Sequence, residues 1–196
     1  MWVIKIGGSL LDSAMLPEWL DGIALNCPGK AVIVPGGGVF AEQVRATQKL
    51  WQYDDRSAHK MAILAMRQMA LLYQGLNANL LLADTLADIQ AGLNRGRTVI
   101  WSPGPELYAQ DDIASSWDVT SDSLAAWLAA RLRADLLLLV KSAAIPAKFT
   151  LQQLSAAGLV DKAFASHLDC GLKLLQRNDL QEFLSMCRAT AGNQQD

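Results

Sequence analysis

A lysine followed closely by two glycines, near the N-terminus, is the group of residues best suited to phosphate chemistry. Lys5 stands inside the apolar run Trp2–Ile6, which continues into Gly7, Gly8 and Ser9. Glycines let backbone N–H groups approach an anion, and an ammonium supplies a compact charge for phosphate oxygens. The spacing matches neither Gly-x-x-x-x-Gly-Lys-Ser/Thr nor Gly-x-Gly-x-x-Gly. The segment predicts a phosphate site, and an edge strand with a tight turn is the ordinary alternative.

A second apolar run ends in the same way. Residues 31–34 lead through Pro35 into Gly36, Gly37 and Gly38. A flexible turn is the commonest meaning of three glycines. If the two runs are neighbouring parallel strands, however, their loops face each other at the carboxyl edge of the sheet, where ligands bind. One loop would then hold a donor phosphate and the other an acceptor.

Two aspartates, Asp118 and Asp122, stand four residues apart around a predicted helix start with Thr120 or Ser121 as its cap. Aspartates at such positions often serve only as caps and as partners of the helix dipole. Here the helix leads into the leucine-rich run 135–140, which predicts a central strand.

The elements that must position these residues follow an alternating order. Apolar strand patterns alternate with helical periodicity, which predicts an α/β protein with a parallel sheet. The predicted strands are residues 2–6, 31–34, 79–83, 98–101, 135–140 and 172–175, and the clearest helices are 57–74, 84–93 and 121–132. Residues 102–116 are irregular and predict a substrate-facing loop, and residues 192–196 predict a frayed end.

Composition favours a small-molecule partner. The chain has 196 residues, is 52% hydrophobic and carries a formal charge of −2. The lack of a long basic run argues against nucleic acid, and the lack of a spanning apolar run or signal peptide predicts no membrane contact and a cytoplasmic location. Three separated cysteines and two histidines predict neither a disulfide framework nor a zinc site, and we expect no metal-ligating residues.

Taken together, these motifs resemble the amino acid kinase family, which includes aspartate, acetylglutamate, glutamate 5-, uridylate and isopentenyl phosphate kinases. The similarity rests on Lys5-x-Gly-Gly-Ser, on Pro35 with its three glycines, on Asp118-x-x-x-Asp122-x-x-Ala125 and on the strand that follows. It implies a three-layer α/β/α sandwich with a mostly parallel central sheet. It also implies one domain over 1–196, with an acceptor part at about 1–115 and an ATP part at about 116–196.

The resemblance also implies a role for each residue. Lys5 would contact the transferring phosphoryl group, Asp122 would orient the active lysines, and Asp118 would lie near the acceptor. Phosphate-lining positions would be Gly7, Gly8 and Ser9 on the donor path and Gly36, Gly37 and Gly38 at the acceptor. ATP with Mg²⁺ is the implied donor. An acceptor oxygen that is already anionic needs no general base, which suits a centre without histidine.

The second active lysine has two candidates. In the family it normally opens a late helix, and Lys162 occupies a comparable position, although the usual Gly-Gly-Met before it is absent. Lys141, followed by Ser142, ends the leucine-rich strand. Its ammonium would contact nucleotide phosphates or pair with a neighbouring carboxylate.

His59 lies at the start of the long helix. It is either a surface histidine or, with Arg56 and the helix N-terminus, a grip for a phosphate already present on the acceptor. Isopentenyl phosphate kinases use a histidine in a similar region. On the second interpretation the acceptor is a phosphate ester and the product a diphosphate.

Within the family, the chain looks most similar to the small kinases of methanofuran biosynthesis. This similarity implies [5-(aminomethyl)furan-3-yl]methyl phosphate as acceptor, with Asp118 beside its ammonium and Trp117 against its furan ring unless Trp117 is a core aromatic. The alternatives are a nucleoside monophosphate or isopentenyl phosphate kinase, and a non-catalytic nucleotide-binding protein, against which the presence of Lys5 and Asp122 argues. Apolar positions on the long Met-rich helix predict a homo-oligomer.

Overall fold

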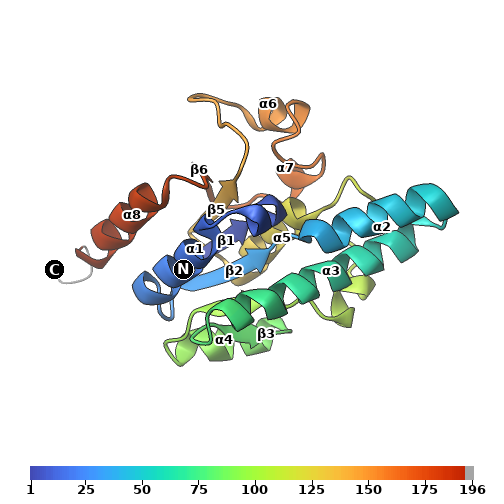
Figure 1. The fold of residues 1–196 in the computed structure, drawn as a ribbon. Coiled ribbons are helices and arrows are strands. Elements are labelled where there is room, and N and C mark those ends of the chain that lie inside the picture. The colour runs from blue at the N-terminus through green and yellow to red at the C-terminus, as the bar shows by residue number, and fades with distance from the viewer. Residues whose placement is uncertain (193–196) are drawn as a thin grey trace.

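The computed structural model describes residues 1–192, whose strands form one central sheet (Figure 1). The strands are β1 Trp2–Ile6, β2 Ala31–Pro35, β3 Leu81–Ala83, β4 Val99–Trp101, β5 Leu136–Lys141 and β6 Gly171–Gln176. Their order is β3-β4-β2-β1-β5-β6, and every adjacent pair is parallel. The predicted parallel α/β sheet is therefore confirmed, with β1 in its interior.

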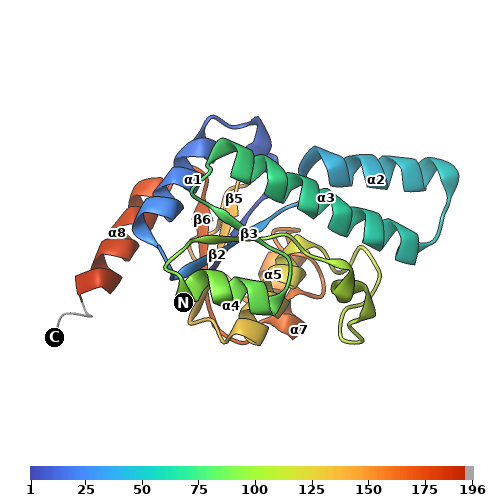
Figure 2. The same cartoon turned by 90° about the horizontal axis from the view of Figure 1, so that it is seen from below.

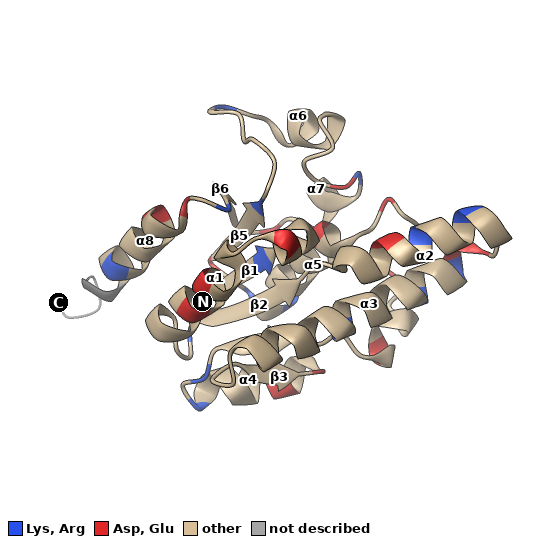
Figure 3. Ribbon diagram, viewed as in Figure 1, with Lys and Arg blue, Asp and Glu red and all other residues tan. Residues whose placement is uncertain are grey.

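The interior strands are apolar because helices cover both faces of the sheet. All five residues of β2 are buried, and so are the last four residues of β1 and the middle four of β5. Figure 3 shows the sheet largely free of charged residues, apart from a blue segment on β1 and charges near the ends of strands. In β1 that charge is Lys5, which is only 5% exposed.

The helices form the two outer layers, which are seen edge-on in Figure 2. One layer contains α1 Met15–Asn26, α8 Leu180–Gly192 and the C-terminal part of α3 Asp55–Leu76; the other contains α4 Leu86–Asn94, α5 Ser121–Leu132 and α7 Phe164–His167. The shorter elements are η1 Gly8–Asp12, η2 Pro105–Ala109 and α6 Leu151–Ala156, and α2 spans Gly38–Trp51. This arrangement confirms the expected three-layer sandwich.

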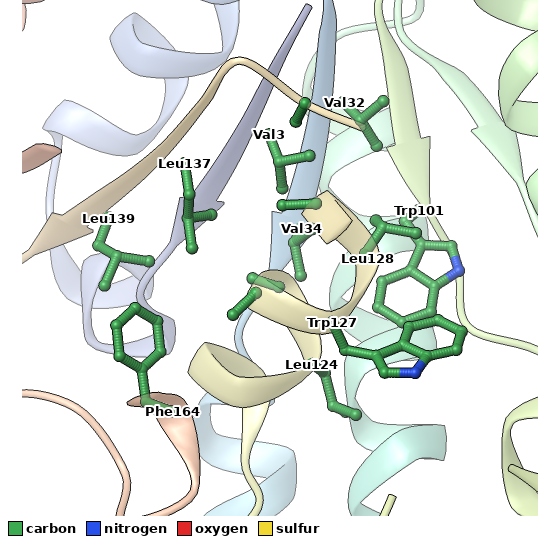
Figure 4. Close-up of a cluster of buried hydrophobic side chains, with 14 of the residues drawn as sticks. Val3, Val32, Val34, Trp101, Leu124, Trp127, Leu128, Leu137, Leu139 and Phe164 are labelled. Atoms are coloured by element: carbon green, nitrogen blue, oxygen red, sulfur yellow. The ribbon is translucent and has the colours of Figure 1, made fainter. Parts of the chain in front are cut away.

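Each face of the sheet has its own hydrophobic core. On the face that α5 covers, Leu124 and Leu128 pack with Val3 and Val34, and Trp101 stacks on Trp127 with ring centroids 6.2 Å apart (Figure 4). On the opposite face Trp19 and Phe183 are fully buried. The buried thiols Cys27 and Cys187 lie side by side here, with Sγ atoms 3.3 Å apart, where the end of α1 contacts α8.

Helices α2 and α3 form an antiparallel pair that extends beyond the sheet (Figures 1 and 2). The turn between them uses Gln52 in the left-handed region, at φ 54°. The α3 helix then begins with Asp54 as its cap, which accepts a 2.8 Å hydrogen bond from the Ser57 N–H. The chain thus reverses sharply, and residues of both helices line a cavity next to the glycine loops.

The crossing connections open a crevice at the carboxyl ends of β1 and β5. After β1 the chain passes to α1 on one face, whereas after β5 it passes through α6 to α7 on the other face. Adjacent parallel strands whose connections leave in opposite directions leave a binding crevice between them. Lys5, Gly7 and Lys141 lie at this point.

Element boundaries differ from the predicted ones by a few residues. The fifth strand runs one residue further than expected and includes Lys141, and α3 begins two residues earlier, behind its aspartate cap. The expected frayed end falls on Gly192, which closes α8, and on residues 193–196, which lie outside the described part of the chain. Among residues 1–192, no helix has both the length and the apolar content needed to cross a membrane.

Candidate active site

Three charged side chains meet in the crevice. Lys5 Nζ lies 2.9 Å from Asp122 Oδ1, and Lys141 Nζ lies 2.6 Å from Asp122 Oδ2. The side chains are 6%, 11% and 9% exposed for Lys5, Lys141 and Asp122. Two neighbouring strands and the start of α5 therefore place two ammonium groups on the two oxygens of one carboxylate.

The cluster carries one positive charge in excess, and this affects its titration. Burial alone would raise the pKa of Asp122, but the charges of Lys5 and Lys141 outweigh it and hold the pKa below its usual range. For Lys141, burial and repulsion from Lys5 outweigh the attraction of Asp122 and lower its pKa to about 8. Asp122 thus keeps its charge, while the charge of Lys141 depends on pH above neutrality.

The two glycine loops touch each other where they follow β1 and β2. A Cβ atom on Gly8 would lie 2.4 Å from the Gly38 nitrogen, and one on Gly36 would lie 2.5 Å from the Gly8 nitrogen. No side chain fits at either position. Gly38 has φ 54° and opens α2, so the positive end of that helix dipole also points at the junction of the loops. The predicted facing loops form one backbone cradle.

The loops after β1 and β5 are also joined. The Gly7 N–H donates to the Val140 carbonyl at 3.0 Å, and the Ser9 and Ser142 hydroxyls are 2.8 Å apart. Ser9 and Ser142, both predicted to lie on the nucleotide side, are therefore neighbours in the fold.

Lys162 and Asp118 form a separate pair outside the buried cluster. Lys162 Nζ lies 2.9 Å from Asp118 Oδ1, and the two side chains are 79% and 55% exposed. Lys162 precedes the short helix α7, so it does stand before a late helix. Of the two candidate lysines, however, Lys141 is the one that contacts Asp122 in this structure.

Asp161, beside Lys162, holds the start of α5 in place. Its carboxylate accepts hydrogen bonds from the backbone N–H groups of Thr120 and Ser123, at 2.8 and 3.1 Å, and from the hydroxyls of both residues. The cap of α5 thus comes from a residue distant in sequence, while the predicted cap residue Thr120 donates its hydroxyl to that cap. Asp161 fixes the turn on which Asp122 sits.

A cavity of about 360 Å³ extends from the glycine cradle between α2, α3 and the start of α5. Its apolar wall includes Val39, Ile63, Met66, Val119 and Leu124. Its polar lining includes Ser9, Asp12, Glu42, Arg45, His59, Thr120 and Ser121. The cavity suits a small acceptor with an apolar body whose anionic end lies on the cradle.

His59 and Trp117 both line this cavity, whereas Arg56 and Asp118 do not. His59 is only 7% exposed and its Nε2 has no hydrogen-bond partner, so the surface alternative for His59 is wrong. Burial lowers its pKa, which favours the neutral ring. Arg56 is exposed at the start of α3.

Trp117 is held in place by α2. Its ring nitrogen donates to Gln48 Oε1 at 2.6 Å, and the Arg45 guanidinium lies 3.9 Å from the ring centroid. Arg45, Glu42 and Asp12 also line the cavity, although no sequence motif singled them out. For Glu42 and Arg45 a signal was present in the helical spacing after the triple glycine, since they are four and seven residues after Gly38 and share a helix face with it. The expected substrate loop 102–116 contributes no residue to the cavity.

The three-layer fold and the two glycine loops beside a buried lysine pair are the features on which the resemblance to the amino acid kinase family rested. The sequence profile of the amino acid kinase family matches residues 1–144. The chain therefore belongs to the amino acid kinase family.

Individual relatives agree with this assignment. The chain is 34% identical over 129 residues to [5-(aminomethyl)furan-3-yl]methyl phosphate kinase of Methanocaldococcus jannaschii, an alignment that covers 65% of this chain and 59% of that protein. The chain thus matches less than two thirds of that relative's length.

Crystal structures of uridylate kinases share the fold. The enzyme of Archaeoglobus fulgidus superposes with a TM-score of 0.66 at 17% identity, covering 95% of both chains. The UMP kinase of Bacillus anthracis gives 0.67 at 14% identity, covering 96% of this chain and 91% of that one.

Proposed function

We propose that the protein is an ATP-dependent kinase that transfers a phosphoryl group to a small phosphorylated acceptor. The observation that carries this proposal is the buried Lys5–Asp122–Lys141 cluster, whose Lys5 lies on the strand that runs into the first of two touching glycine loops. An excess ammonium charge together with closely approaching glycine backbones is suited to an anion whose charge spreads over several oxygens. A merely structural ion pair would require only one lysine.

Phosphoryl transfer needs alignment and charge stabilisation more than covalent participation by the protein. In the proposed reaction, Lys5 reaches the transferring group from β1, and Lys141 reaches the donor phosphates from β5. Asp122 holds both ammonium groups in position and does not itself accept a proton, because its pKa is lowered by the two lysine charges. The amides near Gly8 and Gly38 hold the acceptor phosphate, whose oxygen is already anionic and attacks without a general base.

Magnesium enters this scheme as part of the nucleotide substrate. Both oxygens of Asp122 face lysines, and Asp161 is engaged by four donors from Thr120 and Ser123. The ion would be carried by the phosphate oxygens of ATP, where it neutralises charge that develops during transfer.

For the acceptor, we propose [5-(aminomethyl)furan-3-yl]methyl phosphate, with the diphosphate as product. The named relative supports this choice, and so does the cavity, which combines a phosphate cradle with an apolar wall and a tryptophan. The acceptor part then corresponds to about 1–115 and the nucleotide part to about 116–196, with Trp117 and the start of α5 closing the cavity from the second part.

An ADP-release screen tests the proposal. Purified protein with ATP and Mg²⁺ is offered the furan phosphate, uridine monophosphate and isopentenyl phosphate at equal concentrations, with a no-acceptor control. We expect ADP release with the furan phosphate alone and a diphosphate product by mass spectrometry. Turnover of uridine monophosphate alone would transfer the assignment to a nucleotide kinase, and nucleotide binding without any turnover would indicate a non-catalytic protein.

A further inference from the structure

The side-chain amide of Gln48 joins three separate parts of the chain. Its Oε1 accepts a hydrogen bond from the Trp117 indole N–H at 2.6 Å, and its Nε2 donates to the Tyr53 carbonyl at 3.2 Å and to Asp55 Oδ1 at 2.8 Å. A carboxamide offers an acceptor oxygen and two N–H donors, and all of these have partners here. A flipped amide would set donor against donor at Trp117 and oxygen against oxygen at Asp55, so its orientation is fixed.

Gln48 is itself anchored to the turn that joins α2 to α3. Tyr53 lies in that turn, Asp55 is the first residue of α3, and the Tyr53 hydroxyl donates back to the Val44 carbonyl of α2 at 2.9 Å. Trp117 is 69 residues further along the chain than Gln48, in the segment before α5. The amide therefore ties the indole ring to a part of the fold that has its own internal hydrogen bonds.

The Trp117 ring forms part of the cavity wall, together with Arg45, whose guanidinium lies 3.9 Å from the ring centroid and covers one face. The backbone beside the ring has a different anchor, because the Asp118 carbonyl accepts a 3.0 Å hydrogen bond from the Ala163 N–H. Removing the Gln48 amide would therefore leave the backbone held and release the ring alone.

The energetics of this contact also favour a role in orientation. The Trp117 side chain is only half-buried, so its N–H is able to donate to water when Gln48 is absent. An exchange of a protein partner for water changes stability little. What the Gln48 amide supplies is a defined direction for the ring, which water does not supply.

We propose that Gln48 is a positioning residue for acceptor recognition: it fixes the orientation of the Trp117 ring and thereby sets how tightly the apolar body of the acceptor binds. This inference rests on the proposed function, which places the acceptor in the cavity. Gln48 is not among the lining residues, so it acts through Trp117. None of its three hydrogen bonds involves Lys5, Asp122 or Lys141, so the transfer step should not depend on it.

Steady-state kinetics with the furan phosphate tests this division of roles. In Gln48→Leu the acceptor KM should rise about threefold to tenfold, while kcat and the KM for MgATP change by less than about twofold. The matched control is Gln43→Leu, at an exposed glutamine of the same helix, which should behave as wild type. A fall in kcat at unchanged acceptor KM would overturn the inference.

A double-mutant cycle shows whether the effect passes through the ring. Phenylalanine has no N–H to donate, so Gln48→Leu should add no further rise in acceptor KM to that of Trp117→Phe. Effects of the two substitutions that multiply would show that Gln48 acts elsewhere and would refute the proposal.

Proton–nitrogen NMR of the ligand-free protein tests the positioning without catalysis. The chain has six tryptophans, and the Trp117 indole signal is the one that disappears in Trp117→Phe. In Gln48→Leu that signal should shift and its proton should exchange faster with water, whereas Gln43→Leu should leave it unchanged. An unshifted signal in Gln48→Leu would disprove the contact. If wild type phosphorylates no acceptor, the proposed function fails, and this spectrum still decides whether Gln48 holds the ring.

Discussion

Lys141 and Lys162 differ in every property that matters for contact with a transferring phosphate. Lys141 is buried against Asp122 in the crevice, whereas Lys162 is 79% exposed and pairs with Asp118. An ammonium withdrawn from water stabilises developing charge more strongly than one in bulk solvent. We therefore propose Lys141, on β5, as the second lysine that contacts phosphate.

Substituting each lysine by methionine tests this assignment. Lys141→Met should lower kcat by about 10²–10³, the range for losing one preorganised charged donor. Lys162→Met should change kcat by less than about threefold, because an exposed pair contributes little. Steady-state ADP release at saturating MgATP measures both. Comparable losses in the two variants, or a larger loss for Lys162→Met, would return the role to Lys162.

Lys141 also predicts a pH dependence. Its pKa of about 8 lies below its ordinary value of 10.5, so the free protein loses this charge as pH rises through 8. The KM for MgATP should therefore rise between pH 7.5 and 9 in wild type and remain flat in Lys141→Met.

The same group should make the folded protein more stable as pH rises, although its binding of MgATP weakens. Between pH 8 and 10.5 the unfolded chain binds more protons at this group than the folded chain, so this group's contribution to the unfolding free energy becomes more favourable as pH rises. At pH 7 the buried charge is at its full cost, and Lys141→Met should raise the melting temperature by a few degrees, because Asp122 keeps Lys5 as its partner. A lower melting temperature at pH 7 would contradict the assigned cost.

The sequence was most informative about residues whose role follows from a local pattern. Lys5 and the glycines were identified because a charge inside an apolar strand and glycines at strand ends are unusual side by side. The choice between the two lysines was left open, because it depends on whether β5 extends by one more residue. Arg45 and Glu42 were missed because they look like ordinary exposed residues of an amphipathic helix.

At the scale of elements, the loops after β1 and β2 approach each other so closely that only glycine fits at Gly8 and Gly36. Gly8→Ala would place a methyl group 2.4 Å from the Gly38 nitrogen and must separate the loops after β1 and β2. We expect activity to fall by at least about 10²-fold, because small displacements of reacting groups have effects of this size. The rate under saturating substrates is the measurement.

Gly75→Ala is the matched control for that substitution. Gly75 lies within α3, is exposed, and would have no atom within 4 Å of an added Cβ. Alanine should stabilise the protein by roughly 0.5–1 kcal/mol in denaturant unfolding and leave turnover unchanged. Equal activity of the Gly8→Ala and wild-type proteins would show that the cradle tolerates separation.

Strands and long helices were predictable because their periodicity is local, and most boundaries lay within two or three residues. The cap of α5 could not be predicted in this way, because Asp161 lies 38 residues after Ser123 in the sequence and meets it only in the folded chain. The loop 102–116 was assigned to the substrate because it looked irregular, yet the cavity wall is made by the regular helices α2 and α3.

At the scale of the whole molecule, local sequence patterns do not determine the order of the strands in the sheet. Six apolar strands in a parallel sheet permit many orders, and the placement of β5 beside β1 is what brings Lys141 to Asp122. Periodicity alone indicates an α/β protein with a parallel sheet. The expectation of a three-layer sandwich came from the resemblance to the amino acid kinase family.

An exposed apolar stripe on α3 supports the expected homo-oligomer. Met61, Leu64 and Leu71 are 39%, 49% and 59% exposed, and their spacing of three and seven residues places them on one face. We expect a second copy of the chain to cover this stripe. Leu64→Glu should reduce the sedimentation coefficient to that of a monomer, while Leu25→Glu, at an exposed leucine of α1, should not. A wild-type protein that sediments as a monomer would rule out the oligomer.

Lys5 belongs to a strand hydrogen-bonded on both sides, to β2 and β5, and so it cannot travel toward an incoming ligand. The pair α2 and α3 projects beyond the sheet at the cavity, so we expect any closure around the reactants to involve its outer part. Labels placed at Trp51 on the hairpin tip and at Leu25 on the body should therefore approach each other, or separate, when MgATP and acceptor are both present. In this scheme β1 stays fixed and holds Lys5 in place, while the outer part of α2 and α3 moves.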